Sequence, residues 1–302
     1  MSPDVMVRMG DSVIQHGPLS NRVYLMKLAP EDCPDIIPGL EQLAREKGYT
    51  KIFAKVPETR IAMFKQAGYI TEAYVPGFFR GREGAGFMGF YLDANRQQAT
   101  ERSLLSKVLA IARSKAPTRP RSYSSRDYQI SRMWVSEIHD MAGLYSEVFD
   151  SYPFPIFDPD YLADTMQGKV IYFGVRHQGR LVGLGSAETD LDSLTAEMTD
   201  FATLARHRGK GMAGILLDKM AAETQKMGIL TLYTIARASS FGMNITFSRA
   251  GYGFAGTLIN NTHIAGQVES MNVWYKSAPR QDCLKRNSIG ACLKYLHKER
   301  PF

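Results

Sequence analysis

The stretch SLTAEMTDFATLARHRGKGMA, residues 193–213, decides the fold of this chain. Its first part alternates apolar and polar residues up to Leu204, which predicts a β-strand. From Gly211 to about residue 226, apolar side chains recur at helical spacing, which predicts a helix that ends at Gly228. We therefore expect a strand that enters a helix through a turn containing glycines.

The turn between this strand and helix has the composition of an anion-binding site. A helix start leaves about four backbone N–H groups without intrahelical acceptors, and Gly209 and Gly211 would let an anion approach them. Arg206, Arg208 and Lys210 add full positive charges. We predict a pyrophosphate-binding loop, whose spacing differs from both the P-loop and the dinucleotide-binding fingerprint.

The rest of the chain alternates predicted strands and helices. Strands are expected at 21–29, 51–56, twice within 69–92, and at 128–135, 169–177, 180–189, 229–236, 252–260 and 268–276. Helices are expected at 31–47, 58–66, 97–115, 136–150, 160–167 and 241–249. This order predicts an α/β (α+β) fold in which a mixed sheet is flanked by helices on both faces.

The chain divides into four predicted parts. Residues 1–95 form a first α/β domain, and residues 96–125 form a basic helix followed by a linker rich in proline and serine. Residues 126–276 form the second α/β domain, and residues 277–302 form a basic tail that we expect to be helical.

The first domain resembles the end of the second one. FKQAGY at 64–69 parallels FSRAGY at 247–252, and two predicted strands follow each motif. We interpret the first domain as a degenerate half-repeat of the second. Its equivalent of the glycine turn is LAPEDCPDIIPG, residues 28–39, which lacks the basic glycine pattern and is not expected to bind the same anion.

The composition excludes several classes of protein. The chain has 302 residues, of which 44% are hydrophobic and 22% charged, as in globular proteins. It contains no transmembrane-length apolar run and no apolar signal segment, so we expect neither a membrane span nor secretion. Its three cysteines, Cys33, Cys283 and Cys292, lack metal-binding spacing, which suits free thiols in the cytoplasm and predicts no metal site.

The net charge of +7 is localised. Residues 96–126 carry eight Lys or Arg and one Glu, and residues 277–302 carry six Lys or Arg and two acids. Nucleic-acid binding predicts basic residues gathered on one folded face with aromatic residues between them. The charge lies instead in a connector and a tail, so nucleic acid is not the expected partner.

The glycine turn resembles a signature of the GCN5-related N-acetyltransferase (GNAT) superfamily. Its Arg-x-x-Gly-x-Gly/Ala pattern fits Arg208, Gly211 and Ala213, and a register through Arg206, Gly209 and Gly211 also fits. The resemblance covers about residues 126–276 and implies acetyl-CoA as co-substrate. The cofactor contacts that it implies are Phe201, Ala202, Thr203, Arg208, Gly209, Lys210, Gly211, Met212, Ala213, Ser240 and Asn244.

Acetyl transfer to an amine requires removal of a proton. A primary amine with a pKa of about 10.4 costs about 4.6 kcal/mol to deprotonate at neutral pH, so a base must accept that proton. Glu197 matches the position of the general-base glutamate in many members, and Asp200 is a weaker candidate. Phe247 stands where members often carry a tyrosine that acts as the general acid. We take Tyr252 as the candidate general acid here, with Tyr233 or a water as alternatives.

A narrower resemblance, to the β-lysine N6-acetyltransferases, covers nearly the whole chain. It rests on EAYVPGFFRG (72–81), SYPFPIFDP (151–159), AEMTDFATL (196–204), ARASSFGMNITF (236–247) and ESMNVWYK (269–276). It implies acetylation of the side-chain amine of a small diamino acid, in lysine metabolism or compatible-solute synthesis. The predicted acceptor-site residues are Arg80, Glu147, Tyr152, Phe154 and Asp158.

Two other functions stay open from the sequence. A protein or peptide N-acetyltransferase would need an open groove, and a non-catalytic acyl-CoA sensor would explain the phenylalanine at position 247. The first domain is expected to have a structural or dimer-forming role, with substrate contacts as a further option, because the exposed edge of a half-sheet favours pairing with another sheet.

Overall fold

The structure is a computed structural model, and it describes residues 4–117 and 127–277. Most of the predicted linker, nearly all of the basic tail, and Cys283 and Cys292 lie outside the described residues. Within the described ranges, no helix has the length and apolar character needed to cross a membrane.

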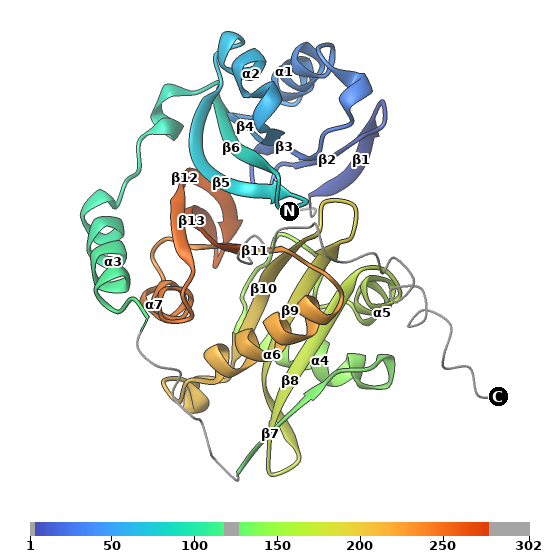
Figure 1. Cartoon of the computed structure of the whole chain (residues 1–302), viewed down its shortest axis with the longest axis vertical. Coiled ribbons are helices and arrows are strands. Elements are labelled where there is room, and N and C mark those ends of the chain that lie inside the picture. The colour runs from blue at the N-terminus through green and yellow to red at the C-terminus, as the bar shows by residue number, and fades with distance from the viewer. Residues whose placement is uncertain (1–3, 118–126, 278–302) are drawn as a thin grey trace, which may run out of the picture.

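The strands of the described residues form one mixed sheet of 13 strands. Figure 1 labels these strands and the helices around them. Its order is β1-β2-β3-β4-β6-β5-β12-β13-β11-β10-β9-β8-β7. The first six strands span Val5–Met9 (β1), Ser12–Gly17 (β2), Arg22–Lys27 (β3), Lys51–Pro57 (β4), Ile70–Phe79 (β5) and Glu83–Tyr91 (β6). The others span Tyr128–Arg132 (β7), Val170–His177 (β8), Arg180–Asp190 (β9), Thr195–Thr203 (β10), Thr231–Arg237 (β11), Gly253–Ile264 (β12) and Gln267–Ser277 (β13).

Helices cover the sheet at the predicted places. They span Ile36–Glu46 (α1), Ile61–Gln66 (α2), Arg102–Ser114 (α3), Ile138–Val148 (α4), Pro159–Gln167 (α5), Met212–Lys226 (α6) and Phe241–Arg249 (α7). The mixed sheet with flanking helices confirms the predicted fold class. The hairpin of β1 and β2 was not predicted.

The helices of the C-terminal half lie on opposite faces of the sheet. Met220 of α6 lies against Gly185 of β9, on one face. On the other face, the hydroxyl of Thr165 in α5 lies 2.9 Å from that of Tyr172 in β8. α3 packs beside α7 (Figure 1), so the basic connector helix covers the C-terminal half rather than standing free.

The two halves of the chain repeat one arrangement. The sheet order β3-β4-β6-β5 of the first half has its counterpart in β10-β11-β13-β12 of the second. The FKQAGY and FSRAGY motifs have the same local structure: the rings of Phe64 and Tyr69 meet edge to face at 5.1 Å, and those of Phe247 and Tyr252 do the same. The division into domains at residues 96–125 stays a prediction, because β5 and β12 join both halves into one sheet.

The sheet curls strongly enough to bring distant strands into contact. β4 and β11 are five positions apart in the sheet order, which in a flat sheet is about 24 Å. Yet the Lys55 ammonium on β4 lies 3.3 Å from the Tyr233 hydroxyl on β11. A hydrophobic cluster with residues from both halves, including Phe53, Phe87 and Val273, fills part of the concave side. The first half therefore covers one end of the second.

Candidate active site

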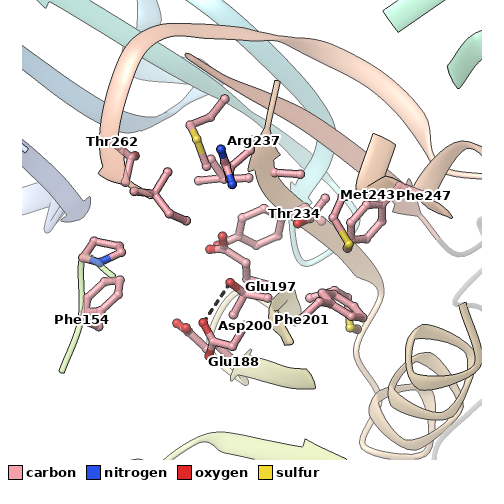
Figure 2. Close-up of a pocket in the computed structure, with 18 of the residues that line it drawn as sticks. Phe154, Glu188, Glu197, Asp200, Phe201, Thr234, Arg237, Met243, Phe247 and Thr262 are labelled. Atoms are coloured by element: carbon pink, nitrogen blue, oxygen red, sulfur yellow. Dashed lines mark hydrogen bonds between the residues drawn. The ribbon is translucent and has the colours of Figure 1, made fainter. Parts of the chain in front are cut away.

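A cavity of about 1300 Å³ lies between the two halves, on the concave side of the sheet. Strands β3 and β4 of the first half and β10, β11 and β12 of the second contribute to its lining, as does the start of α6. Figure 2 shows Glu188, Glu197 and Asp200 gathered at its centre, with Phe154 on one side and Phe201 on the other. Polar groups are thus concentrated inside an otherwise largely apolar space.

The strands β10 and β11 diverge beside this cavity. They are parallel neighbours that pair at only three positions, the last being Glu197 with Tyr233. β10 then continues to Thr203 and β11 to Arg237, and the two strands do not pair with each other beyond that point. A β-bulge around Asp200, whose φ is 52°, bends β10 at this point. The divergence leaves an edge of β10 free to bond an extended ligand.

The glycine turn at the start of α6 has the geometry expected of an anion site. Gly211 is the N-cap of α6 with φ 81°, a conformation that favours glycine, and no side chain caps the helix. The N–H groups of Met212 and Ala213 find no acceptor in the described part of the chain. Arg208 is fixed by a 3.0 Å hydrogen bond from its Nε to the Thr203 carbonyl. Unpaired donors and a cation therefore lie at the end of the diverging strands.

Most of the predicted cofactor contacts line the cavity, and these residues fit a long ligand with a pyrophosphate. The lining includes Phe201, Thr203, Arg208, Gly209, Gly211, Met212, Ala213 and Ser240. The Ala202 side chain is buried in the core. Lys210 is corrected: its ammonium donates to the Tyr128 hydroxyl at 3.0 Å instead of lining the cavity.

The prediction that Asn244 contacts the cofactor is also corrected. It is fully buried, and its amide group donates to the carbonyls of Arg237 and Ser240. Its carbonyl oxygen accepts from Asn272 and from the Trp274 indole, each at 2.8 Å. With all of these bonds made inside the protein, Asn244 fixes the turn between β11 and α7 and does not line the cavity.

Glu197, which the sequence predicts as the base, lines the cavity from β10. Burial raises the pKa of Glu197, whereas the Lys55 ammonium and a hydrogen bond from Tyr233 oppose that rise. Lys55 is itself held between the rings of Tyr24 and Tyr233, at 5.5 and 5.7 Å. A cation from the first half therefore helps to keep a carboxylate of the second half ionised.

Two further carboxylates share the centre of the cavity with Glu197. Glu188 on β9 is its direct cross-strand neighbour, and burial together with the charges of Glu197 and Asp200 raises the pKa of Glu188 well above its ordinary value. Burial also raises the pKa of Asp200, although hydrogen bonds from Ser186 and Tyr152 oppose the rise. Three acids with raised pKa values thus lie together in one cavity, which marks it as a candidate functional site.

The prediction that Tyr252 is the general acid is corrected, because Tyr252 does not line the cavity. Burial raises the pKa of Tyr252, and its hydroxyl has no hydrogen-bond partner in the described residues. Phe247, whose ring lies 5.1 Å away, lines the cavity, and Tyr252 does not. Tyr233 is the alternative that does line the cavity, beside Glu197.

The predicted acceptor residues divide into two groups. Tyr152 and Phe154 line the cavity, and Tyr152 donates to Asp200 at 2.6 Å. Glu147 is corrected, because it is exposed and paired with Arg180 on the outer surface. The prediction that Asp158 binds the acceptor is also corrected, because Asp158 is the N-cap of α5 and does not line the cavity.

Arg80 lies at the rim of the cavity, not at its centre. Its side chain is exposed, and its Nε donates to the Asp192 carbonyl at 2.7 Å in the turn between β9 and β10. Its Nε bond connects the two halves at the surface, and because Arg80 also belongs to the cavity lining, its contact with an acceptor carboxylate stays a prediction.

The sequence interpretation missed several polar residues of the cavity, four of which bear on its chemistry. These four are Arg22, Tyr24 and Lys55 from the first half and Glu188 from the second. Each is a polar residue within or at the edge of a largely apolar strand, which was a signal available in the sequence. Among the described residues, no group of three or more His, Cys, Asp or Glu could hold a metal ion.

Comparison with known proteins places the chain in a family. The acetyltransferase (GNAT) family pattern matches residues 128–252. The β-lysine N(6)-acetyltransferase of Methanococcus maripaludis is 34% identical over 270 residues, covering 89% of this chain and 97% of the relative. That of Methanosarcina mazei is 29% identical over 260 residues, covering 80% and 96%. The N-acetyltransferase YodP of Bacillus subtilis is 29% identical over 268 residues, covering 88% and 95%.

The family match contains the diverging strands, the glycine turn and Glu197. The similarity to the Methanococcus maripaludis enzyme extends along nearly the whole chain, first half included. This protein therefore belongs to the acetyltransferase (GNAT) family and is an acyltransferase.

Proposed function

We propose that the chain transfers the acetyl group of acetyl-CoA to the N6 amine of β-lysine. The observation that carries this proposal is the cluster of Glu188, Glu197 and Asp200 inside a cavity that both halves enclose. Ammonium groups of a diamino acid are attracted by such carboxylates. The names of two relatives that align over most of the chain support β-lysine as the acceptor.

The donor side of the proposal rests on the turn before α6. Acetyl-CoA supplies a thioester-activated acetyl group. The free N–H groups of Met212 and Ala213, together with Arg208, would bind its pyrophosphate. The unpaired edge of β10, from Phe201 to Thr203, would bond its extended arm.

The acceptor amine must lose a proton before it can attack. We assign that proton to Glu197, because Lys55 and Tyr233 favour its ionised form. Burial and the charges of Glu197 and Asp200 raise the pKa of Glu188 well above its ordinary value, so Glu188 retains a proton more readily than Glu197 does. A neighbouring pair of acids with different proton affinities can serve in this way as one base and one neutral partner.

An acceptor screen tests the proposed function. CoA release would be measured with acetyl-CoA and β-lysine, lysine, ornithine, polyamines or peptides. We expect β-lysine to have the highest kcat/KM and the product to carry its acetyl group on N6. Preference for a peptide would contradict the proposal, as would acetyl-CoA binding without turnover on any amine.

The cellular role follows from the same reaction. We propose that the enzyme acts in the cytoplasm and that its product is a compatible solute. Cells that express the active chain and contain β-lysine should then accumulate N6-acetyl-β-lysine after a rise in external salt. Unchanged product levels across salt concentrations would contradict the osmotic role and leave the reaction itself intact.

A further inference from the structure

An amino-acid acceptor carries a carboxylate that must be bound as well as its amines. We propose that Arg22, from β3 of the first half, binds this carboxylate and so selects amino acids over simple diamines. The inference rests on the proposed function, because it assumes an amine acceptor in the same cavity. It assigns to the first half a direct role in acceptor recognition.

Arg22 is a buried cation without an ion-pair partner. It is 4% exposed and lines the cavity. One terminal nitrogen of its guanidinium donates to the Asn261 carbonyl at 2.7 Å and to the Thr262 hydroxyl at 2.9 Å. Its Nε has no partner, and no carboxylate forms an ion pair with it in the described ranges. A buried guanidinium in this state lacks the anion that its geometry favours.

Within the described residues, the acids near Arg22 act on it through their charges but form no ion pair with it. Asp4 is the acid of the first half that opposes the lowering of the Arg22 pKa by burial, but its carboxylate accepts from the Ser20 N–H and makes no ion pair with Arg22. The rings of Tyr24 and Phe53 lie 5.0 and 5.8 Å from the guanidinium carbon. These rings pack against the guanidinium and form no ion pair with it.

The other cations that line the cavity are less suited to this task. Lys55 faces Glu197, and Arg237 donates through two nitrogens to the Glu269 carboxylate. The remaining Lys and Arg side chains of the lining are exposed, namely Lys27, Arg80, Lys169, Arg208 and Arg249. Arg22 is thus the buried cation of the described lining that has neither a carboxylate partner nor full access to water.

Arg22 and Glu197 line the same cavity from different strands. Arg22 lies beside Thr262 of β12, whereas Glu197 lies beside Tyr233 of β11. The Glu197 charge opposes the lowering of the Arg22 pKa, so both groups act within the same cavity. An extended diamino acid would place its carboxylate at Arg22 and its side-chain amine at Glu197.

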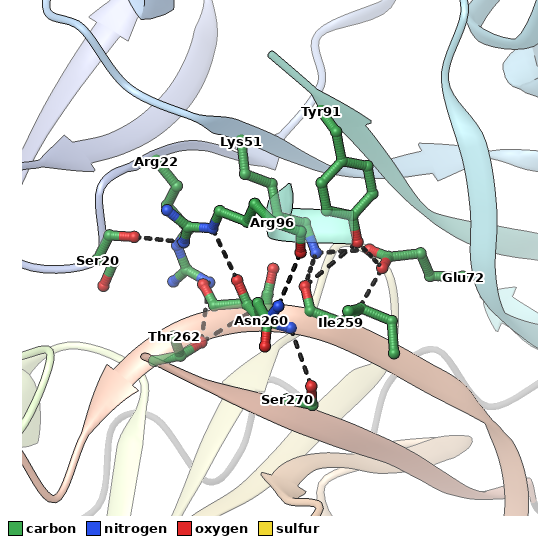
Figure 3. Close-up of polar contacts among 11 residues, drawn as sticks. Ser20, Arg22, Lys51, Glu72, Tyr91, Arg96, Ile259, Asn260, Thr262 and Ser270 are labelled. Atoms are coloured by element: carbon green, nitrogen blue, oxygen red, sulfur yellow. Dashed lines mark hydrogen bonds and ion pairs between the residues drawn. The ribbon is translucent and has the colours of Figure 1, made fainter. Parts of the chain in front are cut away.

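The position of Arg22 is fixed by a buried polar junction, which Figure 3 shows. A break in the register of β12 between Leu258 and Thr262 turns backbone carbonyls toward the first half. Lys51 donates to the Ile259 carbonyl at 2.7 Å, and Arg96 donates to the Asn260 carbonyl at 3.0 Å. Arg22 bonds the next carbonyl along, so three cations of the first half are ordered against one segment.

Glu72 completes this junction. Its carboxylate pairs with Lys51 at 2.8 Å and accepts from the Ile259 N–H at 2.8 Å. Because Lys51 and Glu72 are nearly inaccessible to water, the junction holds the first half rigidly. Arg22 is therefore preorganised for a ligand before any ligand arrives.

The test compares an acceptor with its uncharged amide. kcat/KM would be measured for β-lysine and β-lysine amide with the wild-type chain and with Arg22→Met and Arg22→Lys. Loss of a buried charge partner predicts a fall of roughly 30-fold or more for β-lysine in Arg22→Met. The value for the amide should change little. Arg22→Lys should recover part of the loss because it restores the charge without the planar fork.

Arg96→Met is the matched control. Arg96 is a buried arginine of the same junction that bonds backbone carbonyls and does not line the cavity. We expect Arg96→Met to lower the thermal unfolding temperature while the ratio of kcat/KM for β-lysine and its amide stays at the wild-type value. Acetyl-CoA binding and thermal unfolding would verify that both variants fold.

The result that overturns the inference differs from one that overturns the proposed function. Arg22 has only a structural role if Arg22→Met lowers kcat/KM equally for β-lysine and its amide. The same holds if the wild-type chain has the same kcat/KM for the acid and the amide. If the wild-type chain acetylates peptides instead, the proposed acceptor is wrong. If another diamino acid replaces β-lysine as the best acceptor, the same comparison with its amide tests Arg22 unchanged.

Discussion

The two halves of this acyltransferase share a strand arrangement but differ where a strand leads into a helix. In the second half, LARHRGKG at 204–211 joins β10 to α6 and is basic and rich in glycine. In the first half, LAPEDCPD at 28–35 joins β3 to α1 and is acidic and contains no glycine. The same scaffold therefore presents an anion site once, because charge and backbone freedom at one turn decide it.

The halves also differ at equivalent positions of their parallel strand pairs. Glu197 pairs with Tyr233 at the third position of the β10–β11 ladder, and Tyr24 pairs with Phe53 at the third position of the β3–β4 ladder. The proposed base of one half thus corresponds to an aromatic residue in the other. Because the sheet curls, Tyr24 nevertheless lines the same cavity as Glu197. The first half lacks its own site and completes that of the second.

Replacing Glu197 should have the largest effect on catalysis. Glu197→Gln removes the proposed proton acceptor but keeps its shape, and we expect kcat to fall by about 10²–10⁴. The dissociation constant for acetyl-CoA should stay near the wild-type value, because Glu197 is not part of the turn before α6. Steady-state kinetics and calorimetric titration would measure the two quantities.

Glu147→Gln is the control for this variant. Glu147 is an exposed carboxylate paired with Arg180, outside the cavity. Its replacement should leave kcat unchanged. A loss of activity comparable with that of Glu197→Gln would contradict the assignment of the base and restore Glu147 as an acceptor residue.

The joint between the halves should be the most sensitive point for stability. A side chain at Gly256, where φ is 152°, would overlap with the carbonyl oxygen of Glu72 and with the Ala73 backbone. We expect Gly256→Val to lower the free energy of unfolding by about 2–4 kcal/mol. Gly266→Val is the control, because Gly266 also has positive φ but nothing near its Cβ position. Equal losses in denaturant titrations would show that only local strain was measured.

The repeated elements could be predicted because their signals are local. Phe64 and Phe247 each precede an Ala-Gly-Tyr turn, and the helix and strands around each motif follow from short-range patterns. The β1–β2 hairpin was missed because β1 is a five-residue edge strand with exposed Val5 and Met6. Such a strand has no buried face that would make its pattern distinct.

The site could be predicted only where one segment supplies it. The turn around Gly211 is contiguous, so its composition was enough to find it. Lys55 and Arg22 reach the cavity because the sheet curls, and no pattern within β3 or β4 indicates that curvature. Asn244 was misread for the same reason, since its partners Asn272 and Trp274 come from a distant strand.

The glycine turn allows a direct test of the first contrast. Gly211→Ala would place a methyl group at the left-handed N-cap of α6, and we expect KM for acetyl-CoA to rise about tenfold, a loss of about 1.4 kcal/mol of binding. Gly228→Ala is the matched control, because Gly228 has φ 83° at the other end of α6 and does not line the cavity. Because the two glycines have similar positive φ values, the two variants should strain the backbone equally. A KM that rises in Gly211→Ala alone would therefore show that the methyl group hinders the ligand. A KM that rises equally in both variants would count against the turn as the anion site.

Lys55 offers the finest test of how one half acts on the other. On β4, Lys55 stands two residues beyond Phe53, as Ile235 stands two residues beyond Tyr233 on β11. Burial raises the pKa of Glu197 above its ordinary value of 4.5, and the Lys55 ammonium opposes that rise. The base must be ionised to accept a proton, so kcat/KM falls as pH decreases through the pKa of Glu197. Lys55→Met removes the opposing charge, and the acidic limb of the pH profile should therefore move to higher pH, with the rate recovering on the alkaline side.

Lys226→Met is the control, because it removes a surface ammonium paired with Glu223, and it should leave the pH profile in place. An unchanged or acid-shifted limb in Lys55→Met would mean that the first half does not tune the base of the second.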